Sequence, residues 1–476
     1  MNKYLFIIGF VGTALFTACS TADDLVSEIP SQGLSDEEKA LIVEAGQDSD
    51  VPITIGSLGN RRAMTRTSVE SDEHDLFITP DDQYLGVYCL ATGLQEGAPS
   101  IHNVTPESDD GVVWNGAYPY SNWMDNIPAI VSKYSASTGP LSDATEAYSY
   151  VSFLDPIDLD DESPTETSKV YYYPFGNWYH YDFFAYYPRQ KKADPSDPKG
   201  SDAIGTHTSA RSSYVVFEID GTQDIIWGKA SGDGKSIVDS SNKTVKAYSS
   251  KYLRLMKEVD EDHNGTPDNT EYEVVPAFTF YHLLTQFVFS IKPHDTDASD
   301  IFDKGFKVTE LSLKDVYKDL RLYVACKPED THTMGDLSII SNNVIDIPAS
   351  KIDDDGSPFP IYVAGNEDNT LLDDNEKEVG YVIVPPSLLI SSKTHNQYLV
   401  NLKMQQKDEA GRYPGDDGYS GSDVPDTVVQ LTPPEGGFSA GHKYNITIEI
   451  YNPTNIQATA TLADWNDEAE TVIGVD

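Results

Sequence analysis

The feature that most constrains this chain is an alternation of apolar and polar residues that recurs along most of its length. It is clearest in KYNITIEIY, where Tyr444, Ile446, Ile448 and Ile450 face one way and the intervening residues face the other. The same period of two appears in QYLGVYCLA, SYVVFEIDG, QFVFSIKP and NIQATATLADW. Alternating side chains point to opposite faces of a strand, so each of these segments predicts a β-strand with one buried face.

Turn-forming clusters such as ADPSDPKGSD and DDDGSPFP separate the alternating segments. No window shows sustained helical periodicity, although SDEEKALIVEAG could form a short helix near the N-terminus. Many short strands with turns between them predict an all-β fold of antiparallel β-sandwiches. The length of 476 residues suits two or three domains, and a second run of strands begins near residue 276.

The N-terminus reads MNKYLFIIGFVGTALFTAC, in which one Lys precedes an apolar run from Leu5 to Phe16. That run is too short for a permanent membrane span and is typical of a signal peptide. Ala18 directly before Cys19 resembles a bacterial lipobox, with Phe16 where Leu is usual. We therefore expect residues 1–18 to be a lipoprotein signal peptide and Cys19 to be lipidated. The competing interpretation is an N-terminal core helix with a chance cysteine.

Charge and cysteine content exclude several classes of protein. The chain has 33 basic against 77 acidic residues, which argues against nucleic acid, because binding phosphates needs Lys and Arg. Only Cys89 and Cys326 remain after Cys19, each within an apolar run. Two such cysteines are too few for a disulfide framework, so two buried free thiols are the default expectation, with a single bridge between them as the open alternative.

No catalytic motif stands out, and the chain is predicted not to be an enzyme. HExxH, G-x-S-x-G, the P-loop and the dinucleotide fingerprint are all missing from the sequence. His282 lies among core-like residues, which favours a hydrogen-bonded structural histidine. The aromatic run VYYYPFGNWYHYDFFAYYP, from Val170 to Pro188, could stack sugars. Its alternation favours a pair of strands packed into a sandwich core.

The segment DEDHNGTPDNTE fits the calcium-loop pattern D-x-D-x-N-G-x5-E, with Gly265 at the sharp turn. Pro267 stands where EF-hands usually carry an apolar residue, and the following EYEVV reads as a strand, so a calcium sensor is rejected. A static calcium clip and a metal-free hairpin turn remain open, because turns favour the same residues. The candidate oxygen ligands are Asp260, Asp262, Asn264, the Thr266 carbonyl, Asp268 and Glu271.

Several motifs, in their order along the chain, resemble the fimbrillin family, the lipoprotein-derived subunits of type V pili in Bacteroidetes-type bacteria. These motifs are TRTSVESDEHDLFITPDDQYLGVYCLATG, VYYYPFGNWYHYDFFAYYP, DIIWGKA, FTFYHLLTQFVFSI and GHKYNITIEIYNPTNIQATATLADWNDEAE. The acidic STADDL after Cys19 also resembles the surface-export signal of lipoproteins from such bacteria. The resemblance implies two consecutive transthyretin-like sandwiches, which we place at residues 67–275 and 276–476, after a pro-segment at 19–66.

The resemblance also implies assembly by strand exchange after a protease cuts behind an arginine. A candidate removable strand lies around Ile53 and Ile55, and the arginines that follow it are Arg61, Arg62 and Arg66. Arg66 is the first choice for the cut and Arg62 the second. A donor strand would come from the C-terminus, where NIQATATLADW suits insertion into a groove and suits the subunit's own final strand equally well. Its alternating residues are Ile456, Ala458, Ala460 and Leu462.

We therefore expect a fimbrial subunit at the cell surface, with a tip or accessory role favoured over a shaft role by its long polar insertions. Its expected partners are other pilus subunits, an Arg-specific protease, the outer membrane before cleavage, and a host or bacterial receptor. The alternative is a surface glycan-binding lipoprotein of a polysaccharide-uptake system, with Trp114, Trp123 or Trp178 as stacking platforms. Loss of a lipid anchor by cleavage would distinguish the two, because a glycan-capture lipoprotein needs its anchor.

Overall fold

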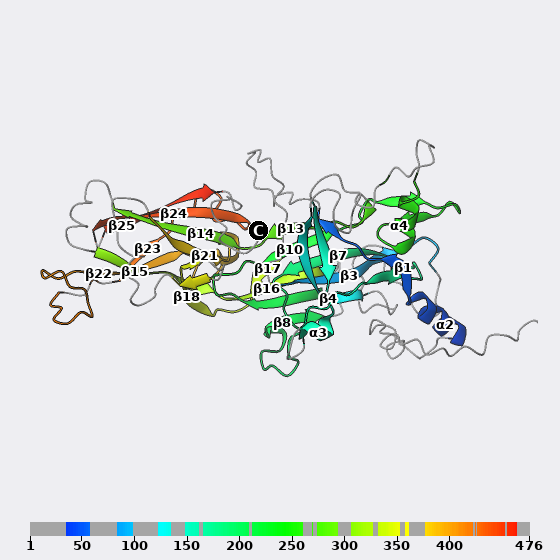
Figure 1. The fold of residues 1–476 in the computed structure, drawn as a ribbon, viewed down its shortest axis with the longest axis horizontal. Coiled ribbons are helices and arrows are strands. Elements are labelled where there is room, and N and C mark those ends of the chain that lie inside the picture. The colour runs from blue at the N-terminus through cyan, green and yellow to red at the C-terminus, as the bar shows by residue number, and fades with distance from the viewer. Residues whose placement is uncertain are drawn as a thin grey trace, which may run out of the picture.

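The structure is a computed structural model, and it is built almost entirely of β-strands with a few short helices (Figure 1). The part of the chain that it describes comprises residues 35–57, 83–98, 122–134, 148–160, 165–208, 212–259, 269, 274–293, 306–326, 332–352, 358–360, 377–421, 424, 426–452 and 455–463. The predicted all-β class is confirmed, and so is the predicted short helix, which is α2 (Asp36–Ala45).

A seven-stranded sheet forms the N-terminal part of the fold, and every neighbouring pair in it is antiparallel. Its order is β13 (Thr279–His282), β10 (Ile226–Ala230), β7 (Tyr179–Tyr187), β3 (Leu85–Leu94), β4 (Asn122–Tyr134), β5 (Tyr148–Phe153) and β2 (Gly56–Ser57).

Both faces of the central strands β3 and β7 are buried. Tyr88 and Phe184 join one apolar cluster, whereas their neighbours Cys89 and Phe183 join another. Successive side chains of a strand point to opposite faces, so the seven-stranded sheet separates two cores. This explains why the two segments read as nearly continuous apolar runs. The prediction that the aromatic run from Val170 to Pro188 packs mainly into the core is confirmed, since Tyr173 and Tyr181 are fully buried.

A four-stranded sheet combines strands from both sides of residue 276. Its order is β17 (Leu337–Ile339), β16 (Asp319–Cys326), β9 (Ser212–Glu218) and β8 (Gly205–Thr208). The central antiparallel pair runs from Asp319 opposite Glu218 to Cys326 opposite Ser212. The division into domains at 275/276 stays a prediction, and the structure adds that strands from the two sides share a sheet.

Two further sheets form the C-terminal part. The six-stranded sheet has the order β20 (Pro358–Pro360), β19 (Ser350–Ile352), β21 (Lys377–Val384), β14 (Thr285–Pro293), β24 (His442–Asn452) and β25 (Asn455–Ala463). The four-stranded sheet has the order β18 (Val344–Pro348), β15 (Phe306–Tyr317), β22 (Leu399–Gln406) and β23 (Thr427–Gln430). The pair β14–β24 is parallel, unlike the predicted antiparallel arrangement, and the long connection between these two strands allows it.

The remaining elements are short. Strand β1 (Asp48–Pro52) pairs with β6 (Tyr172–Pro174), and β11 (Ser236–Val238) pairs with β12 (Thr244–Lys246). The other helices are α3 (Pro156–Asp160), the 3-10 helix η1 (Gly200–Asp202), α4 (Ser250–Met256) and α7 (Ser387–Ile390). None of the helices in the described ranges combines the length and the apolar character that crossing a bilayer requires.

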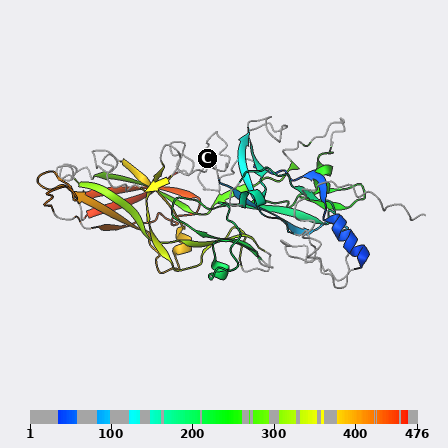
Figure 2. The ribbon, with the colours of Figure 1, turned by 60° about the horizontal axis from the view of Figure 1, so that its bottom comes forward.

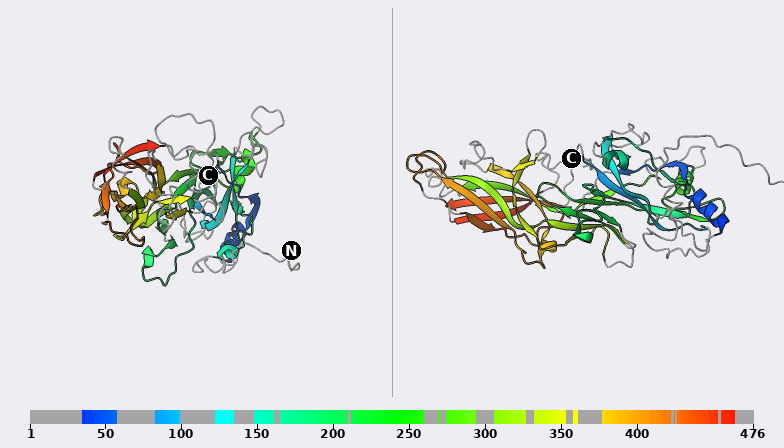
Figure 3. Two further views of the ribbon diagram at one scale, coloured as in Figure 1. Left: turned by 60° about the vertical axis from the view of Figure 1, so that its left-hand side comes forward. Right: turned by 90° about the horizontal axis from the view of Figure 1, so that it is seen from below.

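The molecule is elongated, and its strands run mostly along the long axis (Figure 2). Helices α2 and α4 and strand β1 lie at one end, whereas β15, β22 and β25 lie at the other (Figures 1 and 3). The elements named at the first end all precede residue 257, and those named at the second all follow residue 305.

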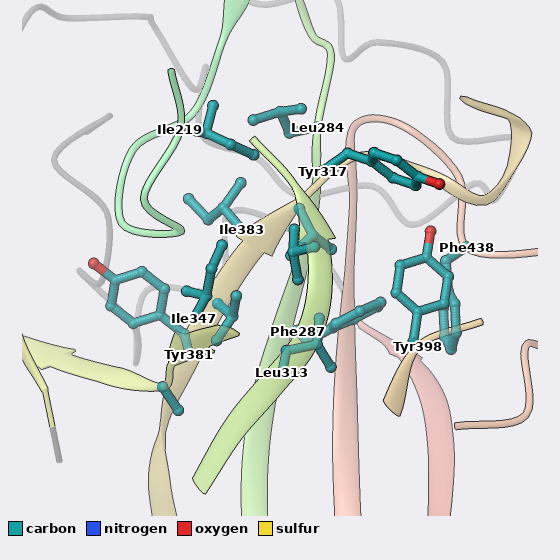
Figure 4. Close-up of a cluster of buried hydrophobic side chains, with 14 of the residues drawn as sticks. Ile219, Leu284, Phe287, Leu313, Tyr317, Ile347, Tyr381, Ile383, Tyr398 and Phe438 are labelled. Atoms are coloured by element: carbon teal, nitrogen blue, oxygen red, sulfur yellow. The ribbon is translucent and has the colours of Figure 1, made fainter. Parts of the chain in front are cut away.

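The core of the C-terminal sheets is aromatic and tightly packed (Figure 4). The Phe287 ring lies 4.6 Å from the Phe438 ring and 5.2 Å from the Tyr398 ring, both edge-on. The four residues of β24 that the sequence places on one face are at most 3% exposed, which confirms that alternation. Such edge-to-face pairs add to the free energy gained from burial alone.

Replacing Phe287 with Ala is expected to lower the free energy of unfolding by about 3–5 kcal/mol, because a fully buried ring leaves a cavity. The measurement is denaturant unfolding followed by circular dichroism. Leu388→Ala is the matched control, since Leu388 is 84% exposed and its loss should change stability by less than about 0.5 kcal/mol. Equal effects of the two substitutions would contradict this account of the core.

Candidate functional site

The N-terminal segment from β1 to β2 is bound along its length to strands that come much later in the chain. The Ile53 amide donates to the Tyr171 carbonyl at 2.7 Å, and the Val151 amide donates to the Ile55 carbonyl at 3.0 Å. Beyond Ile55, Gly56 pairs with Tyr150 of β5. Strand β2 is thereby the last strand at one edge of the seven-stranded sheet.

Gly56 also bonds in the other direction. Its amide donates to the Pro276 carbonyl at 3.0 Å, and the Phe278 amide donates to its carbonyl at 3.1 Å. The segment therefore lies between β5 on one side and residues 276–278 on the other. No sequence pattern predicts these contacts, because they join backbone groups of residues far apart in the chain.

The side chains of this segment alternate as the sequence predicts. Ile53 and Ile55 are 3% and 0% exposed within the N-terminal core, whereas Thr54 between them is half-buried. Val51 packs partly buried against the same core. Burying an isoleucine contributes about 1.5–3 kcal/mol, so the two isoleucines are a substantial part of what holds the segment in place.

Loss of this segment would uncover backbone groups and apolar side chains together. The Tyr171 and Pro276 carbonyls and the Val151 and Phe278 amides would lose their partners. A sheet edge with unpaired backbone groups beside an open apolar groove is a binding site for another strand.

The predicted cleavage residues follow directly after this segment. Arg61, Arg62 and Arg66 lie outside the described residues, which end here at Ser57. The lipidation candidate Cys19 also lies outside them.

The C-terminal candidate strand is β25, which pairs antiparallel with β24 at the edge of the six-stranded sheet. Ala458 and Ala460 are partly buried against the core, whereas Leu462 is 52% exposed. Ile456 lies opposite Ile450 in the register. In this structure β25 serves as the subunit's own final strand, and one of its backbone edges faces away from β24.

The predicted calcium ligands Asp260, Asp262, Asn264, Thr266, Asp268 and Glu271 lie outside the described residues. Within this segment Asn269 is described, and its side-chain amide donates to the Met256 carbonyl at the end of α4 at 3.1 Å. Elsewhere in the described ranges, no group of three or more His, Cys, Asp or Glu side chains is placed to hold a metal ion.

The tryptophans proposed as sugar platforms are mostly covered. Trp123 and Trp178 are 6% and 5% exposed, and the Trp123 indole donates to the Tyr172 carbonyl at 2.6 Å. Stacking on a sugar needs an exposed ring face, which these two residues offer little of. Trp114 lies outside the described residues.

Other residues singled out by the sequence have structural roles. His282 pairs through Nδ1 with the fully buried Asp224 carboxylate, which agrees with a hydrogen-bonded structural histidine. Cys89 and Cys326 are both buried, and neither forms a disulfide within the described residues. Burial raises the pKa of the Cys89 thiol well above its ordinary value, and the nearby Asp182 carboxylate raises it further, so this thiol stays protonated.

Ile55→Asp is expected to release the β1–β2 segment, because it places an unpaired carboxylate in the core at a cost of about 3 kcal/mol or more. The measurement is hydrogen exchange at the Ile53 and Gly56 amides, which should speed up roughly a hundredfold for that loss. Thr54→Asp is the matched control, since that neighbouring side chain lies on the other face and is half-buried. Unchanged protection in Ile55→Asp would show that the core does not hold the segment.

Comparisons with known proteins find similar solved structures only at low scores. No family model matches the chain, and no curated protein matches it either. A candidate cell adhesion protein from Bacteroides uniformis is 14% identical with a TM-score of 0.37, over 87% of this chain and 99% of that one. The tip fimbrial protein Mfa3 from Porphyromonas gingivalis, with a C-terminal truncation, is 9% identical with a TM-score of 0.30, over 87% and 99%.

The fimbrial anchor protein Mfa2 from Porphyromonas gingivalis is 8% identical with a TM-score of 0.28, over 89% of this chain and 99% of that one. These names are of the kind that the fimbrillin resemblance leads one to expect.

Proposed function

We propose that this chain is a fimbrial subunit of the type V pilus kind, exported as a lipoprotein and activated by cleavage after an arginine. The observation that carries the proposal is that residues 53–56, with two buried isoleucines and backbone bonds to residues 151, 171, 276 and 278, precede the arginine cluster. A cut at Arg66, or at Arg62 or Arg61, leaves this segment joined to the sheet by noncovalent contacts alone.

Once cut, the segment can leave and a neighbouring subunit can supply a strand. The vacated edge offers the backbone groups of Val151, Tyr171, Pro276 and Phe278, and a groove previously filled by two isoleucines. An incoming strand satisfies the backbone groups through the same pairings, and alternate side chains fill the groove. Cleavage thus converts a closed subunit into an acceptor.

Strand β25 is the proposed donor. Its inward residues Ala458 and Ala460 are small and only partly buried, so leaving β24 forfeits little apolar burial. Its alternation of Ile456, Ala458, Ala460 and Leu462 provides one apolar face for insertion. A strand that packs weakly in its own subunit and whose apolar face suits the groove of a neighbouring subunit can act as a donor.

We further propose a tip or accessory position in the fimbrium, with a shaft position as the second choice. The arginine cluster disfavours a membrane anchor, since an anchor must keep its lipid. The polar segments at 141–169 and 189–212 contain β5, α3, η1 and β8, and connections between such elements are where recognition commonly lies. The proposed partners are other pilus subunits, an Arg-specific protease, the outer membrane before cleavage, and a surface receptor. The burial of Trp123 and Trp178 favours this function over glycan capture by those tryptophans.

Treatment with an Arg-specific protease is expected to remove residues up to Arg66 and to produce polymers visible by electron microscopy. Gels and N-terminal sequencing identify the cut, and Arg66→Ala should block it or move it to Arg62 or Arg61. Resistance of the unmodified protein, or a cut without any polymer, would contradict the proposal.

The donor role is tested in the same assay. Ala458→Lys with Ala460→Lys should leave cleavage intact and abolish polymers, because charged side chains cannot enter an apolar groove. Thr459→Lys is the control on the exposed face of β25. Normal polymers from the double variant would exclude β25 as donor.

We also propose that the acidic segment from Asp260 to Glu271 holds a structural calcium ion, which would neutralise its carboxylates. Calorimetric titration with calcium should show binding below millimolar concentration, and Asp260→Asn with Glu271→Gln should abolish it. Asp233→Asn, an exposed carboxylate outside the loop, serves as the control. No binding below millimolar calcium would leave only a hairpin turn.

A further inference from the structure

A pocket with a volume of about 210 Å³ lies at the end of the molecule that carries α4. Four segments that are far apart in the sequence meet around it: residues 95–98 after β3, residues 176–178 before β7, residues 243–245 at the start of β12, and Lys251 of α4. Its size suits one small ligand. The sequence offers no motif for it, because each segment contributes only one to four residues.

The walls of the pocket are fixed by hydrogen bonds between these segments. The Gln95 side chain donates to the Lys246 carbonyl at 2.7 Å and accepts from the Lys246 amide at 2.8 Å. The Gln95 amide donates to the Trp178 carbonyl at 2.9 Å. Gln95 thus joins three of the segments, and the pocket exists before any ligand arrives.

Two further side chains complete the frame. The Asn177 side-chain oxygen accepts from the Ser250 hydroxyl at 2.7 Å and from the Lys251 amide at 2.8 Å. The Glu96 carboxylate accepts from the Thr244 amide at 2.7 Å. A carboxylate has about four lone-pair positions, so Glu96 can also accept from a hydroxyl donor in the pocket.

Two lysines, Lys243 and Lys251, line the pocket in a chain whose net charge is −44. Lys251 forms an ion pair with Asp239, and this contact with the Lys251 ammonium lowers the pKa of Asp239 to about 2. The Lys243 ammonium packs closely against the turn at Gly97. A Cβ atom added at Gly97 would lie only 2.5 Å from Lys243 Nζ. The Lys243 amide donates to the Asp239 carboxylate at 2.9 Å, and within the described residues the Lys243 ammonium forms no ion pair of its own.

We propose that this pocket binds one carboxylate-bearing sugar residue of the hexuronic acid class. The Lys243 ammonium would pair with the ligand carboxylate, assisted by the remaining N–H groups of Lys251. Glu96 would accept from a sugar hydroxyl. An ammonium–carboxylate pair supplies the strong charge-assisted contact, and the hydroxyl contact distinguishes a sugar acid from a simple anion.

This site differs from the tryptophan stacking platform that the sequence suggests. It would bind the carboxylate and hydroxyl groups of a sugar acid, whereas a stacking platform binds the sugar through an exposed indole face. It also stands apart from the strand-exchange edge, because none of its lining residues belongs to β1, β2 or β25. Binding can therefore be tested without protease treatment or polymer formation.

Calorimetric titration of the full chain with sodium glucuronate should show binding that is roughly tenfold tighter than for glucose or acetate, the difference that one charge-assisted hydrogen bond provides. Lys243→Gln should weaken glucuronate binding by roughly the same factor and leave thermal stability unchanged, because this side chain is exposed. Raising the salt concentration should weaken binding, as expected for an exposed charge pair.

Lys199→Gln is the matched control, since Lys199 is an exposed lysine away from the pocket, and it should bind glucuronate as the unmodified chain does. Glu96→Gln should reduce the preference for glucuronate over acetate, because it weakens the acceptor for the sugar hydroxyl. Absence of glucuronate binding, equal affinity for acetate, or an unchanged affinity in Lys243→Gln would each overturn the proposal.

Discussion

The pairing of β9 with β16 is the interaction on which the arrangement of this molecule depends. It joins a strand that precedes residue 276 to one that follows it, through an antiparallel ladder from Ser212 to Glu218. On one face, Phe217 and Leu322 enter the apolar cluster that also contains residues of the C-terminal sheets. The pairing of β13 with β10 is a second sheet contact between strands from the two sides of residue 276.

The other face of the same ladder carries a row of rings. His207, Tyr214 and Tyr323 lie directly opposite one another on three adjacent strands. The His207 ring stacks on Tyr214 at 4.9 Å, and the guanidinium of Arg321 lies 4.7 Å from the centre of the Tyr214 ring. Cross-strand ring pairs and cation–π contacts each add a modest stabilisation, so the ladder is supported on both faces.

The sequence predicted the features that follow from local pattern. The alternation in β24 identified its buried face, and the apolar runs around Cys89 and Cys326 identified buried strands. It could not predict the parallel neighbour of β14, the bonds of Gly56 to residues 276–278, or the pocket beside Lys243. Each of these depends on backbone groups or single side chains brought together from distant segments. Such contacts do not produce a local pattern of apolar and polar residues that could be recognised in the sequence.

The parallel pairing of β14 with β24 has a consequence for the order of folding. Strand β14 lies in the middle of its sheet, yet its neighbour β24 comes more than 140 residues later in the sequence. In this pair Phe287 lies opposite Tyr444. During synthesis or export, one edge of β14 therefore stays open until the last strands emerge. Contacts of such long sequence separation form slowly, because the loop between them must close first. A chain stopped short of β24 would present a long apolar edge, and such an intermediate needs protection against association with other chains.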